Sequence, residues 1–271
     1  MEETLRRILG EATDLDMTNV SSAVIYTMLV IAGLLVLVSI YALIVEIVLG
    51  IRYVKYNKRK NSCGKTGEQV AREILDNNGL SWIKVSKSGS FLFGNSYSHY
   101  FKKVRLRRRT WQKDSLTSLA MASQKSSLAI LDKEGDADMK MRVKLTPLIY
   151  VGPLAFVPLI IIGLVLDILI FDSSSGHAVI VCSIIGLVIY LISFAMSVYE
   201  LRTEKKAQVR AIKIMSEEGL ATAEEIEMCK ALFKLYNIEY INNMIIALLE
   251  LIYRILQIVM YAQGSKSSTS N

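Results

Sequence analysis

The stretch that decides the fold is SAVIYTMLVIAGLLVLVSIYALIVEIVL, which runs from Ser22 to Leu49 and contains one charged residue, Glu46. A helix needs about 20 mostly apolar residues to cross the hydrocarbon core of a bilayer. The run is too long for the apolar core of a signal peptide, and the residues before it are acidic rather than basic. We therefore predict a membrane-spanning helix at 22–49. Glu46 and Asp167 lie near span ends, where a carboxylate can reach water, so we interpret both as solvated.

Three further apolar runs follow, at 146–171, 178–198 and 240–261. The second and third spans are separated only by the polar turn DSSSGH, so they should form a transmembrane hairpin. The fourth run contains Glu250 and Arg254, which lie one helical turn apart and can pair. That run either crosses the membrane or lies in its interface. The expected fold is mostly α, a polytopic membrane protein with about four hydrophobic helices.

The charge distribution predicts how the chain is oriented. The protein has a net charge of +7, and region 50–145 contains 21 Lys and Arg against 8 Asp and Glu. Lys and Arg near spans favour the cytoplasmic side. We expect a multi-pass protein of the cell membrane with segment 1–21 outside, 50–145 and 199–239 in the cytoplasm, and a disordered tail at 262–271. Three cysteines without a CxxC pair indicate neither a disulfide framework nor a zinc knuckle.

Periodicity and capping signals predict the elements of the water-exposed segments. Residues 66–80 should form a helix capped by Thr66 and ended at Asn78-Gly79. Thr222 and Glu225 have capping-box spacing at the start of another helix. The remaining elements expected are short strands at 81–85 and 104–107, and helices at 110–131, 200–218 and 222–236, with Gly219 ending the second of these helices.

Several short motifs carry a family resemblance. TGEQVAREILDNNGL at 66–80 is the most specific, followed by Ser98-His99-Tyr100 and Val104-Arg105-Leu106. Together they resemble the bacterial membrane proteins described as putative neutral zinc metallopeptidases, the YugP-like family, over roughly residues 30–260. The resemblance implies a zincin-like cytoplasmic helical region with a short strand element. In that family, two His at i and i+4 of an HEVGH motif and a Glu from a later helix bind zinc, and the Glu between the His activates water.

This sequence departs from the family at the catalytic motif. Counting without gaps from the flanking motifs places Gln124 at the first His, Lys125 at the general base and Leu128 at the second His. The third ligand corresponds to Glu204, with Glu200 one turn earlier. Leu has no ligand atom, and a charged Lys repels a divalent cation and cannot act as a base. The resemblance therefore implies a site that has lost zinc, with no cofactor, no metal and no catalytic residue.

The function expected is that of a pseudopeptidase, a non-catalytic membrane homologue that binds or regulates other proteins. One alternative is an active zinc metallopeptidase with unrecognised ligands, and another is a structural or anionic-lipid-interacting membrane protein. We expect Lys125 to pair with Glu204 or Glu200, and packing around Leu128 to replace the zinc contact.

Expected partners are membrane lipid, and other membrane proteins or an active paralogue; His99 is either a structural residue or helps to hold an extended peptide. The run RLRRR lacks interleaved stacking aromatics and is tethered to a membrane, which argues against nucleic acid. The residues singled out for contact with a partner or with lipid are His99, Arg105, Arg107, Arg108 and Arg109.

Overall fold

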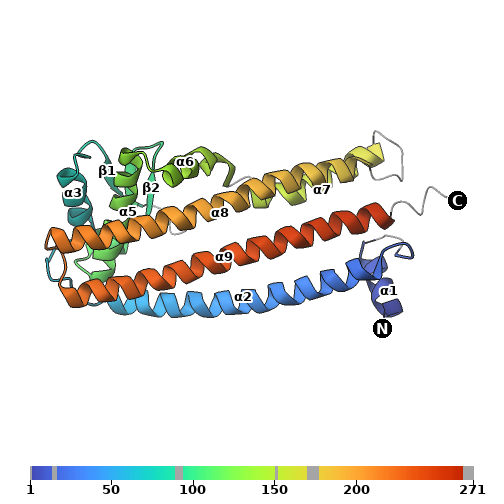
Figure 1. Cartoon of the computed structure of the whole chain (residues 1–271), viewed down its shortest axis with the longest axis horizontal. Helices are drawn as coiled ribbons and strands as arrows, with labels where there is room; N and C mark the ends of the chain where they lie inside the picture. Colours follow the sequence, from blue (N-terminus) through green and yellow to red (C-terminus); the bar gives the residue numbers. More distant parts are fainter. Residues whose placement is uncertain (1, 14–16, 89–93, 150–151, 170–176, 265–271) are drawn as a thin grey trace. The chain divides into compact units, whose positions relative to one another are not determined.

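A computed structural model describes residues 2–13, 17–88, 94–149, 152–169 and 177–264. The chain divides into two compact units. One, here called the span unit, comprises Met1–Tyr41, Leu145–Met196 and Asn242–Asn271. The other, here called the basic unit, comprises Ala42–Lys144 and Ser197–Ile241. Most of the residues of both units are helical, as the sequence predicts (Figure 1).

Three of the described helices are long and apolar enough to cross a membrane, namely α2 (Ser22–Tyr56), α8 (His177–Glu217) and α9 (Ala223–Gly264). The shorter α7 (Gly152–Leu169) contains the apolar stretch Pro158–Leu169. At 1.5 Å per residue, the 41 residues of α8 reach about twice the thickness of a hydrocarbon core. The charged second half of α8, from residue 199 onward, therefore extends beyond the length that a hydrocarbon core can hold.

The span unit shows how α7 and α8 pack against each other (Figure 1). Asp167 accepts hydrogen bonds from the backbone N–H groups of Ala178 at 2.9 Å and Val179 at 3.0 Å. A carboxylate at a helix N-terminus satisfies donors that the helix itself leaves free. The expectation of a solvated Asp167 is wrong, because this residue is only 5% exposed and caps α8. In the fourth run, Glu250 accepts a hydrogen bond from Tyr190 at 2.6 Å.

The basic unit contains the strands and the short helices. The helices are α3 (Gly67–Asn77), α4 (Arg108–Gln112), α5 (Leu116–Glu134) and the first part of α6 (Ala137–Ile149). The strands are β1 (Lys84–Lys87), β2 (Ser96–Ser98) and β3 (Lys103–Leu106). β3 lies in the middle of the sheet, parallel to β1 and antiparallel to β2. Buried apolar residues of α3, α5 and the sheet share one core with residues of α8 and α9.

The motif at 66–80 contains α3, and the capping residues that predicted this helix are those that start and end it. The Thr66 side chain accepts from the Gln69 N–H, and the Gln69 side chain accepts from the Thr66 N–H, which completes a capping box. Gly79 adopts φ 64°, a left-handed conformation that ends the helix. At Gly67, a Cβ would lie 2.2 Å from the Thr110 carbonyl oxygen, so only glycine allows α3 to start this close to α4.

Several expected boundaries differ from the structure. The helix expected at 110–131 is two helices, because Lys113 is extended and Ser115 caps α5 by accepting from the Ser118 N–H. The strand expected at 81–85 forms at Lys84–Lys87. Two segments expected separately, 222–236 and 240–261, lie in the single helix α9.

Other differences concern the chain ends and the hairpin turn. The segment before the first span contains a helix that was not predicted, α1 (Glu2–Thr13). The helix α9 continues to Gly264, so the expected tail cannot begin at 262. The rest of that tail, 265–271, and the turn at 172–176 lie outside the described residues.

Candidate functional site

The helix α5 holds the positions that the sequence aligned with the family's catalytic motif. Its side chains from Leu116 to Leu131 are all buried, so the helix has no face to solvent over four turns. A helix buried on every side lies at the centre of its unit. The buried part includes five consecutive polar residues, at 123–127. Buried polar groups need partners inside the protein, and α5 finds one set of them on α8.

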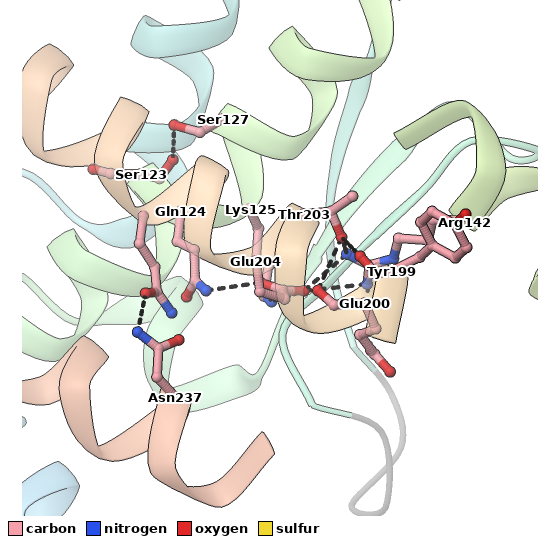
Figure 2. Close-up of polar contacts among 11 residues, drawn as sticks. Ser123, Gln124, Lys125, Ser127, Arg142, Tyr199, Glu200, Thr203, Glu204 and Asn237 are labelled. Atoms are coloured by element: carbon pink, nitrogen blue, oxygen red, sulfur yellow. Dashed lines mark hydrogen bonds and ion pairs between the residues drawn. The ribbon is translucent and has the colours of Figure 1, made fainter. Parts of the chain in front are cut away.

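Lys125 forms the central contact of this site (Figure 2). Its ammonium nitrogen lies 2.9 Å from Oε1 and 2.8 Å from Oε2 of Glu204. Gln124 donates from Nε2 to the same Oε2 at 2.7 Å. The Lys125 side chain is 8% exposed and that of Glu204 is 1% exposed. The ion pair that the sequence predicted between α5 and α8 is therefore present, with Glu204 rather than Glu200 as the partner.

Arg142 of α6 completes the cluster from a third helix. Its guanidinium donates to Oε1 of Glu204 at 3.1 and 3.2 Å, to Glu200 at 3.4 Å and to the Thr203 hydroxyl at 2.8 Å. Burial alone would raise the pKa of Glu204, but the nearby Lys125 ammonium and Arg142 guanidinium hold that pKa below its ordinary value. The carboxylate is therefore ionised and bonded by three side chains at neutral pH.

Sequence reasoning named Lys125 and Glu204 but missed Arg142. Its place in a basic segment directly before the apolar run at 146–171 was the one signal in the sequence. Nothing in a linear pattern shows that a side chain of α6 reaches the same carboxylate as one of α5. Leu128 is 1% exposed and shares a buried cluster with Ala207, one turn after Glu204, which confirms the expected packing at the second His position.

The residues at this site do not fit a zinc ion. Leu128 has no atom that can bind a metal. The Lys125 ammonium already contacts both Glu204 oxygens, which a metal ion would need as ligands. Both oxygens already accept hydrogen bonds from cationic or amide donors. Among the described residues, no group of three or more His, Cys, Asp or Glu side chains could hold a metal ion. The arrangement supports a structural ion cluster that joins α5, α6 and α8.

His99 lies away from this cluster, in the turn between β2 and β3. Its Nδ1 is 2.7 Å from Oδ2 of Asp132, and the same oxygen accepts from the Tyr97 hydroxyl at 2.6 Å. His99 is thus fastened to the C-terminal part of α5, in agreement with the structural role considered for it. The four arginines predicted to contact a partner or lipid lie in different local structures. Arg105 lies in β3, Arg107 precedes α4, and Arg108 and Arg109 are the first two residues of α4.

Comparison with known proteins places the chain among membrane proteins of one family. The family model described as "putative neutral zinc metallopeptidase" matches residues 27–259. The chain is 26% identical over 204 residues to the "putative membrane protease YugP" of Bacillus subtilis (strain 168), with 73% of this chain and 83% of that protein covered. No solved structure matches the chain. The match to the family model extends over most of the chain, so this protein is a member of the putative neutral zinc metallopeptidase family.

Proposed function

We propose that this protein is a pseudopeptidase, a family member that keeps the scaffold of a zinc metallopeptidase and uses it for binding or regulation. The observation that carries the proposal is the Lys125–Glu204 contact, with nitrogen–oxygen distances of 2.9 and 2.8 Å. A positive charge stands at the family's general-base position and is bonded to the carboxylate aligned with the third zinc ligand. A metallopeptidase forms its attacking hydroxide on a bound zinc ion. That ion can be held only by side chains that are free to coordinate it.

The charge pattern of the cluster supports the same proposal. Lys125 and Arg142 supply two positive charges, and Glu204 and Glu200 supply two negative charges. The cluster of these four side chains is therefore neutral as it stands, with Glu200 at its partly exposed edge. Adding a divalent cation would leave an excess of positive charge in a site with little access to water, which is costly. We infer that the ion cluster replaces the zinc as the connection between α5 and α8.

The proposed partners are other membrane proteins, including an active paralogue, and membrane lipid. The proposed arrangement places the protein in the cell membrane with its N-terminus outside and region 50–145 in the cytoplasm. Its support is the excess of Lys and Arg in that region and the positive-inside tendency of membrane proteins. Reporter domains inserted into the full chain after residue 20 and after residue 144 would test this arrangement. The two reporters should lie on opposite sides of the membrane.

Metal analysis tests the pseudopeptidase proposal directly. The detergent-purified protein is dialysed against a weak chelator and its zinc is measured by elemental mass spectrometry, next to hydrolysis of a fluorescent casein. We expect far less than one zinc per chain and no hydrolysis above that of the Glu204→Gln variant. Near-stoichiometric zinc, with hydrolysis that a strong chelator abolishes, would overturn the proposal and favour an active peptidase with other ligands.

A further inference from the structure

The three-stranded sheet of the basic unit has one core face and one basic face. Val104 of β3 is fully buried, and its register partners Val85 and Tyr97 pack against the same core. Side chains alternate between the faces of a sheet, so the neighbours of Val104 point the other way. This opposite face, here called the basic sheet face, carries three cations and three hydroxyls: Lys84, Lys103, Arg105, Ser86, Ser96 and Ser98.

Exposed aromatic rings lie beside these cations. Trp82 is 55% exposed and Phe101 is 67% exposed. The Lys102 nitrogen lies 5.7 Å from the Trp82 ring, and Lys103 and Arg105 lie 5.1 and 5.5 Å from the Phe101 ring. Cation–aromatic contacts of this length are weak at an exposed site. They do not explain why two large apolar rings stay in water, whereas an amphipathic environment would accept both the rings and the charges.

The charge of this surface is unbalanced. Residues 81–113 contain nine Lys and Arg and no Asp or Glu. Over the part of the chain that the structure describes, the cations at these rings and on the basic sheet face form one ion pair, between Lys102 and Asp132 at 3.9 Å. The three cations of the sheet face itself have no carboxylate within salt-bridge distance among those residues. A surface with free positive charge and hydroxyl donors suits an anionic, oxygen-rich partner.

A hydrogen bond connects this surface to the segment that leads toward the membrane. The Tyr100 hydroxyl donates to the Val143 carbonyl oxygen at 2.9 Å, and Val143 belongs to α6. Along the chain, α6 is followed by the apolar helix α7. Tyr and Trp are enriched where a membrane protein passes from hydrocarbon to water. The turn that carries Tyr100 and Phe101 is thus held to α6, the helix that precedes the apolar helix α7 along the chain.

We propose that the basic sheet face, with Trp82 and Phe101, lies against the headgroups of anionic phospholipids. The cations contact lipid phosphates, the Ser96 and Ser98 hydroxyls donate to phosphate oxygens, and the two rings enter the boundary between headgroups and acyl chains. Anionic lipid attracts Lys and Arg near a membrane surface, each by about fivefold in binding. This proposal does not depend on the state of the zinc site, and it can fail while the pseudopeptidase proposal stands.

Tryptophan fluorescence of the full chain tests the proposal, because the protein has only two Trp residues. The variant Trp111→Phe keeps Trp82 as the single reporter, and the protein is placed in nanodiscs of phosphatidylcholine alone or mixed with phosphatidylglycerol. We expect Trp82 emission to shift to the blue in the mixed discs, with stronger quenching by brominated lipid. Raised salt should reverse both changes. If Trp111→Phe folds poorly, difference spectra between the wild type and Trp82→Phe report the same residue.

A matched pair of variants assigns the effect to the basic sheet face. Lys103→Gln with Arg105→Gln should abolish most of the shift that depends on phosphatidylglycerol. Lys205→Gln with Lys234→Gln removes the same charge from exposed positions of α8 and α9 and should leave it unchanged. Equal Trp82 emission in the two kinds of nanodisc, or equal losses in both double variants, would overturn the proposal. So would a Trp82 shift caused by an added acidic peptide but not by lipid, which would indicate a protein partner.

Discussion

Lys125 and Glu204 are separated by 79 residues in sequence, yet they form a buried ion pair in which one nitrogen is shared between both carboxylate oxygens. Arg142 bonds to the same carboxylate from a third helix. Both cations therefore share Glu204, which also accepts from Gln124, whereas Arg142 has a second carboxylate partner in Glu200. This asymmetry decides which substitution at the cluster should be most harmful.

The variant Glu204→Gln should destabilise the protein more than Lys125→Met. Loss of Glu204 leaves two buried cations without their shared carboxylate, and breaking a buried pair in this way costs about 3–5 kcal/mol. Loss of Lys125 leaves Glu204 paired with Arg142, so the free energy of unfolding should fall by less. Thermal unfolding in detergent, followed by tryptophan fluorescence, measures both. A Glu204→Gln variant at least as stable as Lys125→Met would contradict the role given to Glu204.

A second buried acid should make the stability depend on pH. Glu225 is 3% exposed and accepts from the Ser62 N–H at 2.8 Å and from the Thr222 N–H at 2.9 Å. Burial acts to raise the pKa of Glu225, but these hydrogen bonds and that of the Ser62 hydroxyl outweigh it and lower the pKa. A lowered folded-state pKa stabilises the fold above the unfolded-state value of about 4.3. That contribution is lost as the pH falls through the folded-state pKa.

The variant Glu225→Gln should therefore lose about 1–3 kcal/mol at pH 7. Its deficit relative to the wild type should shrink as the pH falls below about 4, since Glu225 of the wild type is then protonated as well. Urea unfolding at a series of pH values measures this difference. Glu227→Gln is the control, because Glu227 is 70% exposed and its ion pair is with the exposed Lys230. A deficit that stays constant down to acid pH would argue against an ionised Glu225.

Local signals in the sequence predicted those helix boundaries that have clear capping residues, but they missed α1 and several other boundaries. The capping box at Thr66 and the glycine ends at Gly79 and Gly219 were predicted because such signals act within a few residues. The break at Lys113 was missed, since the apolar pattern continues through it and only the Ser115 cap restarts the helix. The continuity of α9 was missed for the opposite reason, because the polar part and the apolar part have different compositions but no breaker between them.

The candidate site shows the same division between local and long-range information. The register from the flanking motifs predicted that Lys125 would pair with Glu204 or Glu200, because a family scaffold fixes which helices face each other. Arg142 and Asp167 could not be assigned from the sequence. Each reaches a partner on another helix, and the partner is chosen by packing rather than by spacing along the chain.

The contact between α7 and α8 should be sensitive to one glycine. A Cβ at Gly163 would lie 2.7 Å from Cα of Val179 and 3.0 Å from the Ala178 carbonyl oxygen, and a backbone cannot yield as a side chain does. Gly163→Ala should lower the thermal midpoint by an amount that corresponds to roughly 1–3 kcal/mol. Gly33→Ala in α2 is the control, since a Cβ there meets nothing within 4 Å. Equal midpoints for the two variants would show that the helices are not this close.

The cap on α8 should depend on the acceptor atoms of Asp167 rather than on its charge alone. Asp167→Ala removes both bonds to the Ala178 and Val179 N–H groups and should cost about 1–2 kcal/mol. Asp167→Asn keeps one side-chain oxygen and should lose less. Thermal unfolding of the two variants in the same detergent separates these effects. If Asn and Ala prove equally harmful, the charge and not the acceptor geometry stabilises the helix.

Restoring the family's ligand types at the aligned positions should restore zinc binding, if the register and the scaffold are as described. In the triple variant Gln124→His, Lys125→Glu and Leu128→His, two imidazoles one turn apart on α5 would face Glu204 of α8. The Lys125 ammonium would no longer be bonded to the Glu204 carboxylate, whose oxygens would then be free to bind zinc. We expect about one zinc per chain by elemental mass spectrometry, and a thermal midpoint that rises on adding zinc, because a ligand that binds only the folded state stabilises it.

The matched control is the double variant Gln124→His with Leu128→His, which keeps Lys125. It supplies both imidazoles but leaves the ammonium 2.9 and 2.8 Å from the two Glu204 oxygens, so it should bind zinc far more weakly than the triple variant. Equal zinc in the two variants would mean that Lys125 does not exclude the metal. A triple variant that unfolds cooperatively but holds no zinc would mean that Gln124 and Leu128 are not the aligned ligand positions, and the pseudopeptidase proposal would lose its structural support.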